Sequence, residues 1–154
     1  MATQARARAA AAGAAGSFGL RVLAVMLGVF FIAMSVSKIG WITDSGILLQ
    51  KFQVFLQKAP PSVRWYLETV CIPGAPIFAR LVPLGECSLG VALIVGFWTR
   101  MAAIVAFLMV LNFHFATSAF WSADFLRDGT GLPVLGGLLA IAISGSRLPF
   151  SVSR

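Results

Sequence analysis

The chain has 154 residues, of which 59% are hydrophobic and only 11% are charged. Because soluble globular proteins carry about a quarter charged residues, this composition excludes an ordinary water-soluble domain and predicts an all-α integral membrane protein. The net charge of +7 comes from basic residues scattered among apolar segments. They form no stripe that could follow phosphates, which argues against nucleic acid as a partner. The expected partner is the lipid bilayer, whose anionic surface suits a basic protein.

Residues 1–18 form an Ala-rich tail with Arg6 and Arg8 and no acidic residue. We expect a short interfacial helix or a loose cytoplasmic tail. A cleavable signal peptide is the competing interpretation. The apolar run that follows is long for a signal peptide and has no clear cleavage site, so we expect the segment to be retained.

The first predicted span covers residues 20–41, with Arg21 and Lys38 near its ends and Trp41 as an interfacial anchor. About twenty helical residues cross a hydrocarbon layer of about 30 Å. The connection that follows contains an amphipathic segment over residues 44–58, which is too short to span and is suited to the membrane surface. Pro60 and Pro61 end it.

Three further spans are predicted over residues 76–98, 99–121 and 132–148, the last being marginal in length. The second and third are joined by a tight turn and should be antiparallel neighbours. The sequence thus predicts one domain over residues 19–150, a bundle of four transmembrane helices with an interfacial amphipathic helix between spans 1 and 2. Four spans place both termini on one side. The basic residues favour the cytoplasmic side of a bacterial-type inner (cytoplasmic) membrane.

Five polar residues are expected in the outer half of the bundle, on three of its helices: Lys38, Arg80, Glu86, Asn112 and His114. Counted by helical rise, Glu86 lies about 15 Å deep and Asn112 about 18 Å from the opposite end of an antiparallel helix. Such a cluster could bind a polar head group, relay a proton, or hold a quinone carbonyl through His114 or Asn112. The alternative is that Glu86 is neutral and hydrogen-bonds between helices as part of the packing.

No metal or cofactor is required by the sequence. His114 is the only histidine, so a haem or chlorophyll ligand is a weak interpretation, since a bis-histidine haem needs a second. The two cysteines, Cys71 and Cys87, lie in unlike contexts and are interpreted as inert thiols.

Small residues recur every four positions on two spans and predict close helix packing. They are Ser88, Ala92 and Gly96 on the second span, and Gly136, Ala140 and Ser144 on the fourth. Packing within the chain is sufficient to explain them, and a face for a partner subunit is the alternative.

The sequence holds no nucleotide-binding loop, no metalloprotease motif and no Ser-His-Asp set. A non-catalytic subunit is therefore expected.

A family resemblance rests on short motifs around the second span: Leu84-Gly85-Glu86, Leu89-Gly90, Ala92-Leu93, Gly96 and Thr99-Arg100. With Arg21 and Lys38 on the first span, these resemble the DoxX family over roughly residues 20–147. The stretch from Tyr66 to Phe78 looks closest to the DoxD branch, the small subunit of thiosulfate:quinone oxidoreductase. The resemblance implies a four-helix membrane protein, often coupled to a redox partner and sometimes to quinone, with no established catalytic set. If the chain belongs to an enzyme, the resemblance implies a quinone-linked oxidoreductase. The 44–58 segment and the Ala-rich tail do not match the family pattern.

The expected function is accordingly an accessory membrane subunit of a larger redox or electron-transfer complex that contacts quinone. One alternative is a purely structural subunit of a respiratory or photosynthetic complex. A second is a small transporter, which the lack of an internal repeat or broken helix disfavours.

Overall fold

The computed structural model describes residues 2–144 and 148–152, and every regular element within them is helical. Three helices are long and apolar enough to cross a membrane: the Gly13–Val36 part of α1 (Ala2–Val36), α5 (Ala75–Val95) and α6 (Thr99–Ala116). This confirms the all-helical membrane protein. The helix α8 (Leu132–Ile143) has 12 residues and is about 18 Å long, so by length it falls short of a full crossing. The fourth span stays a prediction.

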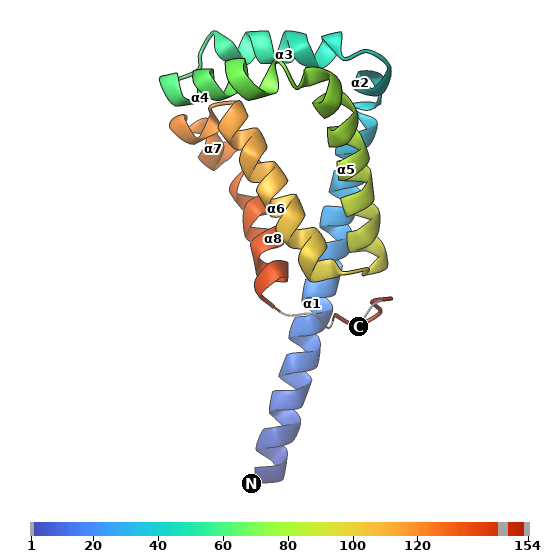
Figure 1. The fold of residues 1–154 in the computed structure, drawn as a ribbon. Helices are drawn as coiled ribbons and strands as arrows, with labels where there is room; N and C mark the ends of the chain where they lie inside the picture. Colours follow the sequence, from blue (N-terminus) through green and yellow to red (C-terminus); the bar gives the residue numbers. More distant parts are fainter. Residues whose placement is uncertain (1, 145–147, 153–154) are drawn as a thin grey trace.

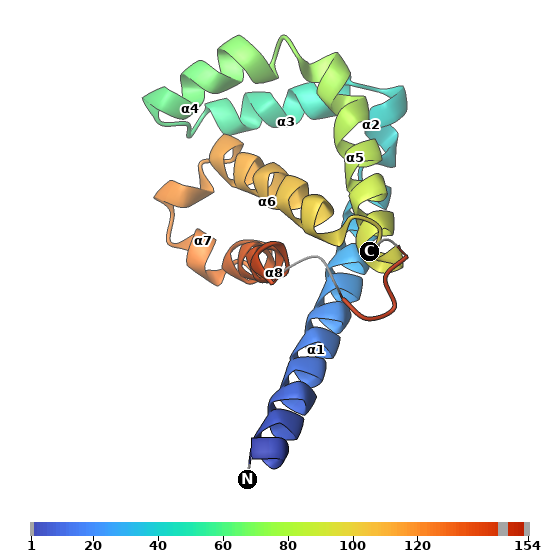
Figure 2. The same cartoon turned by 60° about the horizontal axis from the view of Figure 1, so that its bottom comes forward.

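The long helices run up and down side by side (Figure 1), with α1 against α5 and α6 against α8. Two short helices, α3 (Gly46–Leu56) and α4 (Pro61–Tyr66), lie across one end, which we call the capped end. The α5–α6 turn and the two ends of the chain lie toward the opposite end, which we call the turn end. Figure 2 views the same arrangement with the turn end brought forward.

The first helix differs from the prediction at both ends. It begins at Ala2, so the Ala-rich tail continues the span without a break and projects from the rest of the protein (Figure 1). Alanine has the highest helix propensity, which explains the continuation. The helix ends at Val36 instead of Trp41, where the Ser37 hydroxyl donates to the Met34 carbonyl. Such side-chain bonds compete with the helical ladder. Trp41 lies in the separate short helix α2 (Ile39–Thr43).

The amphipathic segment predicted over residues 44–58 contains α3. Its apolar residues Leu48 and Phe52 are buried and pack on a cluster that includes Val63 and Leu67. The apolar face of α3 therefore covers the end of the bundle, whereas the sequence pattern alone suggested lipid. Pro61 is the first residue of α4, where its missing N–H costs no hydrogen bond. A π-helical stretch, η1 (Leu67–Cys71), continues α4 toward α5.

Two spans end earlier than predicted because of left-handed residues. The helix α5 stops at Val95, where Gly96 adopts a φ of 79°, a C-terminal cap that glycine supplies readily. The helix α6 ends at Ala116, and Ser118 follows with a φ of 62°. The short helices η2 (Ala119–Trp121) and α7 (Asp124–Arg127) then lead to α8. Residues 145–147, through which the fourth predicted span was expected to run, lie outside the described residues, as does Arg154.

The helices α1 and α5 touch through two glycines. A Cβ built on Gly28 would lie 2.7 Å from the Gly90 carbonyl oxygen, and one built on Gly90 would lie 2.8 Å from that of Gly28. Both distances are too short for a real carbon–oxygen contact. The two backbones can approach this closely only because neither residue carries a side chain.

We expect Gly28→Ala to destabilise the protein by about 2 kcal/mol, since overpacking a close contact usually costs about 1–3 kcal/mol. The measurement is SDS-induced unfolding of the purified chain in mixed micelles. Gly136→Ala is the matched control, because a Cβ there meets nothing within 4 Å. Equal stability of the two variants would contradict the predicted contact.

Candidate functional site

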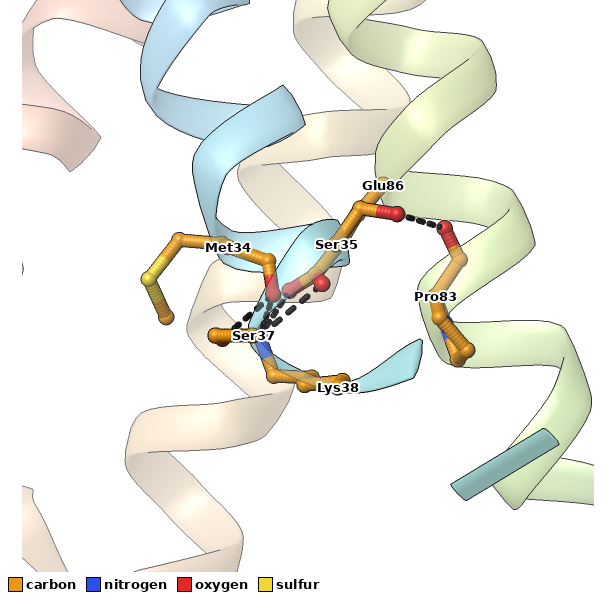
Figure 3. Close-up of polar contacts among 6 residues, drawn as sticks. All are labelled: Met34, Ser35, Ser37, Lys38, Pro83 and Glu86. Atoms are coloured by element: carbon orange, nitrogen blue, oxygen red, sulfur yellow. Dashed lines mark hydrogen bonds and ion pairs between the residues drawn. The ribbon is translucent and has the colours of Figure 1, made fainter. Parts of the chain in front are cut away.

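The centre of the candidate site is an ion pair between Lys38, which lies in the turn between α1 and α2, and Glu86 on α5. The Lys38 ammonium lies 2.7 Å and 2.9 Å from the two carboxylate oxygens of Glu86 and 3.2 Å from the Met34 carbonyl oxygen. Figure 3 shows the ammonium held between that carbonyl and the carboxylate. The side chain of Glu86 is only 2% exposed and that of Lys38 12%. Charged groups placed within a membrane protein are costly unless they are paired, and they mark functional sites by default.

Local structure fixes the two partners of this pair. Lys38 follows the end of α1, where the chain turns across the bundle. Glu86 lies three residues after Pro83, and the Ser35 hydroxyl donates to the Pro83 carbonyl at 2.8 Å. This bond ties the end of α1 to α5 one turn from the ion pair (Figure 3). The register that brings ammonium and carboxylate together is thus set by a neutral hydrogen bond beside them.

Asn112 is held by a tyrosine that the sequence did not mark as a site residue. The Tyr66 hydroxyl donates to the Asn112 amide oxygen at 2.7 Å. Burial raises the pKa of the Tyr66 phenol and also that of the Cys71 thiol. Both groups therefore stay protonated at neutral pH, and Tyr66 acts as a donor. In the sequence Tyr66 is an aromatic residue in the connection between the first two predicted spans, a kind of residue that suits head-group depth; its pairing with Asn112 needs the fold.

A cavity of about 380 Å³ lies beneath α3, and we call it the large cavity. Its polar lining includes Lys38, Lys51, Tyr66 and Asn112. Its apolar lining is largely aromatic: Trp41, Phe52, Phe55, Phe78 and Phe113. The ammonium groups of Lys38 and Lys51 lie 5.8 Å and 6.0 Å from the centre of the Trp41 ring, within cation–π distance. An apolar pocket with a few polar groups is the usual form of a small-molecule site.

A second cavity of about 170 Å³, the small cavity, lies on the other side of the ion pair. Glu86, His114, Asp128 and Thr130 line it, together with Phe30 and other apolar groups. Met34, Phe113 and Thr117 line both cavities, so the two adjoin. The pair thus presents its ammonium to the large cavity and its carboxylate to the small one.

His114 is buried, with 6% of the residue exposed, and its ring nitrogen Nδ1 lies 2.8 Å from the Val110 carbonyl oxygen. A carbonyl can only accept, so Nδ1 carries a proton and donates. The ring also packs edge-on against Phe125 at 5.3 Å between centroids. Only Nε2 is left for other chemistry, whether as a proton acceptor or as the haem or chlorophyll ligand considered from the sequence.

Asp128 stands at the surface beside this cavity. Its carboxylate accepts from the Thr130 hydroxyl at 2.7 Å and from the Thr130 backbone N–H at 2.9 Å. These two hydrogen bonds lower the pKa of Asp128 below its ordinary value, with a smaller contribution from His114. In the sequence Asp128 is an ordinary acidic residue in a loop, and only the fold places it beside His114, on the lining of the same cavity.

The structure arranges four of the five predicted polar residues around the two cavities, in an order that depth alone did not predict. Glu86 pairs with Lys38, and Asn112 pairs with Tyr66. Arg80 lies apart from them: it is exposed and donates to the Pro76 carbonyl of its own helix. It lines neither cavity. Arg80 follows the buried Ala79, and one step along a helix rotates the side-chain direction by about 100°, which is enough to place Arg80 at the exposed surface of α5.

The small-residue faces also lie differently from the expected pattern. On α5, Ser88 is exposed, Ala92 is partly buried and Gly96 forms the left-handed cap. On α8, the three residues Gly136, Ala140 and Ser144 are all exposed. The neighbouring Gly137 faces α1 instead, where a Cβ would lie 3.2 Å from the Leu27 side chain. The predicted face of α8 therefore does not pack within the chain.

Among the described residues no group of three His, Cys, Asp or Glu side chains could hold a metal ion. Cys71 is buried in the capped end, whereas Cys87 is exposed on α5.

In comparison with known families, a family model described as DoxX matches residues 19–119, about two thirds of the chain. The matched region contains Lys38, Tyr66, Glu86, Asn112 and His114, and it ends before Asp128 and α8. No curated protein and no solved structure matches the chain.

Proposed function

The chain belongs to the DoxX family of membrane proteins, and on that basis we propose that it is a quinone-binding accessory subunit of a larger membrane redox complex. The observation that carries the proposal is the large cavity, in which the ammonium groups of Lys38 and Lys51 and the amide of Asn112 stand among aromatic rings. A quinone matches this lining, because its ring is flat and apolar and its two carbonyl oxygens accept hydrogen bonds.

The hydrogen bonds around the cavity leave suitable donors for those carbonyls. Since Tyr66 donates to the amide oxygen of Asn112, the amide NH₂ is the group of Asn112 that is left to donate to a ligand. Lys38 reaches the same cavity with its ammonium, already anchored by Glu86. Donors held in place before binding cost less conformational entropy when the ligand arrives.

In this proposal α8 completes a bundle of four membrane crossings with both termini in the cytoplasm, as the sequence predicted. The capped end then faces the outer side of the inner membrane. The DoxD branch, with its link to thiosulfate:quinone oxidoreductase, is the form of the family that a quinone site would suit.

Binding is tested by titrating the purified chain in lipid nanodiscs with decylubiquinone and following tryptophan fluorescence. We expect saturable quenching that is largely lost in Trp41→Phe, since Trp41 lines the cavity. Asn112→Leu should weaken binding about ten-fold, which corresponds to one lost hydrogen bond of about 1.4 kcal/mol. Gln53→Ala, on the exposed side of α3, is the control and should bind like the parent chain.

Quenching that does not saturate, or equal affinities for Asn112→Leu and Gln53→Ala, would overturn the quinone site. A purely structural subunit predicts that outcome, together with loss of the assembled complex when Ala140 on the exposed face of α8 is enlarged to Leu. The subunit role is tested by isolating the chain from its native membrane in mild detergent. A stoichiometric flavin, haem or iron–sulfur protein that reduces added decylubiquinone is expected with it.

A further inference from the structure

The small cavity is lined both by Glu86, the most deeply buried charged residue among those whose burial the structure describes, and by residues at the surface. At one end is the carboxylate of Glu86, whose side chain is 2% exposed. At the other are Asp128, which is exposed, and Thr130, which is half-buried. Its volume of about 170 Å³ has room for several water molecules, and its polar groups supply the partners that such water needs.

We propose that the small cavity is a proton pathway between Glu86 and the water at the capped end, with His114 as the proton carrier. The proposal rests on the proposed function in one respect: a quinone that receives two electrons from a redox partner also takes up two protons, and this pathway would supply them. The quinone itself binds on the other side of the ion pair.

The hydrogen bond of His114 defines how the proton would pass. Because Nδ1–H stays donated to the Val110 carbonyl, only Nε2 can exchange. A hydronium ion on the Asp128 side gives its proton to Nε2, which leaves water and an imidazolium. Nε2 then returns the proton to a water on the Glu86 side, and that water passes it to the carboxylate. No proton is gained or lost by the ring in the complete cycle.

The charges along the pathway favour a proton at each point. Asp128 is a carboxylate at the surface, and its pKa is lowered by Thr130, so it attracts protons to the opening without holding them at neutral pH. His114 can carry the positive charge next to it. At the inner end, Glu86 contacts the Lys38 ammonium. A proton that reaches Glu86 is therefore next to Lys38, the residue that faces the proposed quinone in the large cavity.

The pathway can be tested without any quinone by infrared spectroscopy of the chain in nanodiscs. In Lys38→Met the Glu86 carboxylate loses its counter-ion and should take up a proton, since a lone charge at this depth neutralises itself. The chain has only five acidic residues, and the other four lie outside the spans. A carboxylic acid band in Lys38→Met at neutral pH is therefore expected to come from Glu86. Loss of this band in Lys38→Met/Glu86→Gln would confirm that assignment.

On transfer from H₂O to D₂O, this band should shift within the mixing time in Lys38→Met. Two second substitutions should slow the shift at least ten-fold: Ala119→Phe, which fills the cavity from its wall, and His114→Phe, which removes the carrier. Equal exchange rates in all three chains, or slow exchange already in Lys38→Met, would overturn the pathway. Circular dichroism and SDS-unfolding curves like those of Lys38→Met establish that each double variant is folded.

The two proposals fail separately in this design. Ala119 lines the small cavity and not the large one. The single variant Ala119→Phe should therefore bind decylubiquinone, and show the same fluorescence quenching, as the parent chain. If Ala119→Phe slows hydrogen exchange but the parent chain does not bind decylubiquinone, the proton pathway is supported and the quinone-binding function is excluded.

Discussion

Replacing Glu86 by leucine is expected to destabilise the folded protein by about 3–5 kcal/mol, the usual cost of removing one partner of a buried ion pair. The cost arises because Lys38, whose side chain is only 12% exposed, is left without its carboxylate partner in a region of low dielectric. The Met34 carbonyl, 3.2 Å from the ammonium, compensates for only part of that loss. SDS-induced unfolding in mixed micelles, followed by near-ultraviolet circular dichroism, measures the effect.

The double variant Lys38→Met/Glu86→Leu should recover most of this stability, because an apolar pair needs no compensation. It should still fail to bind decylubiquinone, which separates the structural role of the pair from its role in the large cavity. Ser88→Ala is the control on the same helix; the residue is exposed, so a change within about 0.5 kcal/mol is expected. If the single and double variants are equally unstable, the loss comes from packing and not from an unpaired charge.

Arg21→Leu is expected to cost about 3 kcal/mol, because the guanidinium donates two hydrogen bonds that carry its charge and each contributes about 1.5–3 kcal/mol. One goes to the Leu93 carbonyl at 2.8 Å and the other to the Ile94 carbonyl. These carbonyls lie in the last turn of α5, where carbonyl groups lack partners within the helix. The positive charge of Arg21 also interacts favourably with the negative end of the helix dipole. Only 8% of Arg21 is exposed, so water cannot replace the lost bonds fully.

Arg100→Leu makes the same change at the turn end on an exposed residue and should be nearly neutral. Arg21→Lys keeps the charge, but lysine is shorter and lacks the forked guanidinium that can donate to two carbonyls. Its stability should therefore lie between those of Arg21→Leu and Arg100→Leu. SDS-unfolding midpoints of the three variants, compared at equal protein-to-detergent ratio, give the order. Stability of Arg21→Leu equal to that of Arg100→Leu would show that the contact to α5 contributes nothing.

The apolar segments of the bundle could be predicted from hydropathy, but the points where they end depend on single residues. The third span is predicted to reach Trp121, whereas α6 ends at Ala116 and the left-handed Ser118 lies two residues beyond that end. Similarly, Trp41 was assigned to the first span as its anchor, and the turn at Ser37 and Lys38 separates them. Apolar residues on both sides of such turns give no hydropathy signal for the break.

The candidate site shows what depth along a helix can and cannot predict. Counting residues along the helices predicts a similar membrane depth for Glu86 and Asn112. A similar depth does not determine the direction in which each side chain points from its helix. Glu86 turns toward Lys38, 48 residues earlier, and Asn112 turns toward Tyr66 on α4. Arg80, placed at the edge of the same cluster, turns outward. Pairing of this kind is a property of tertiary packing, which a single sequence does not contain.

The ion pair of Lys38 and Glu86 has one further consequence, for the response to membrane voltage. Ammonium and carboxylate cancel, so the pair carries no net charge and the transmembrane potential exerts almost no net force on it. A single added proton changes this, because an elementary charge moved through the whole membrane is worth about 2.3 kcal/mol per 100 mV. Glu86 lies within α5, a candidate membrane span, so a proton that reaches it crosses only part of the membrane potential. Protonation of the pair should therefore depend on that part of the voltage, although no part of the protein has to move.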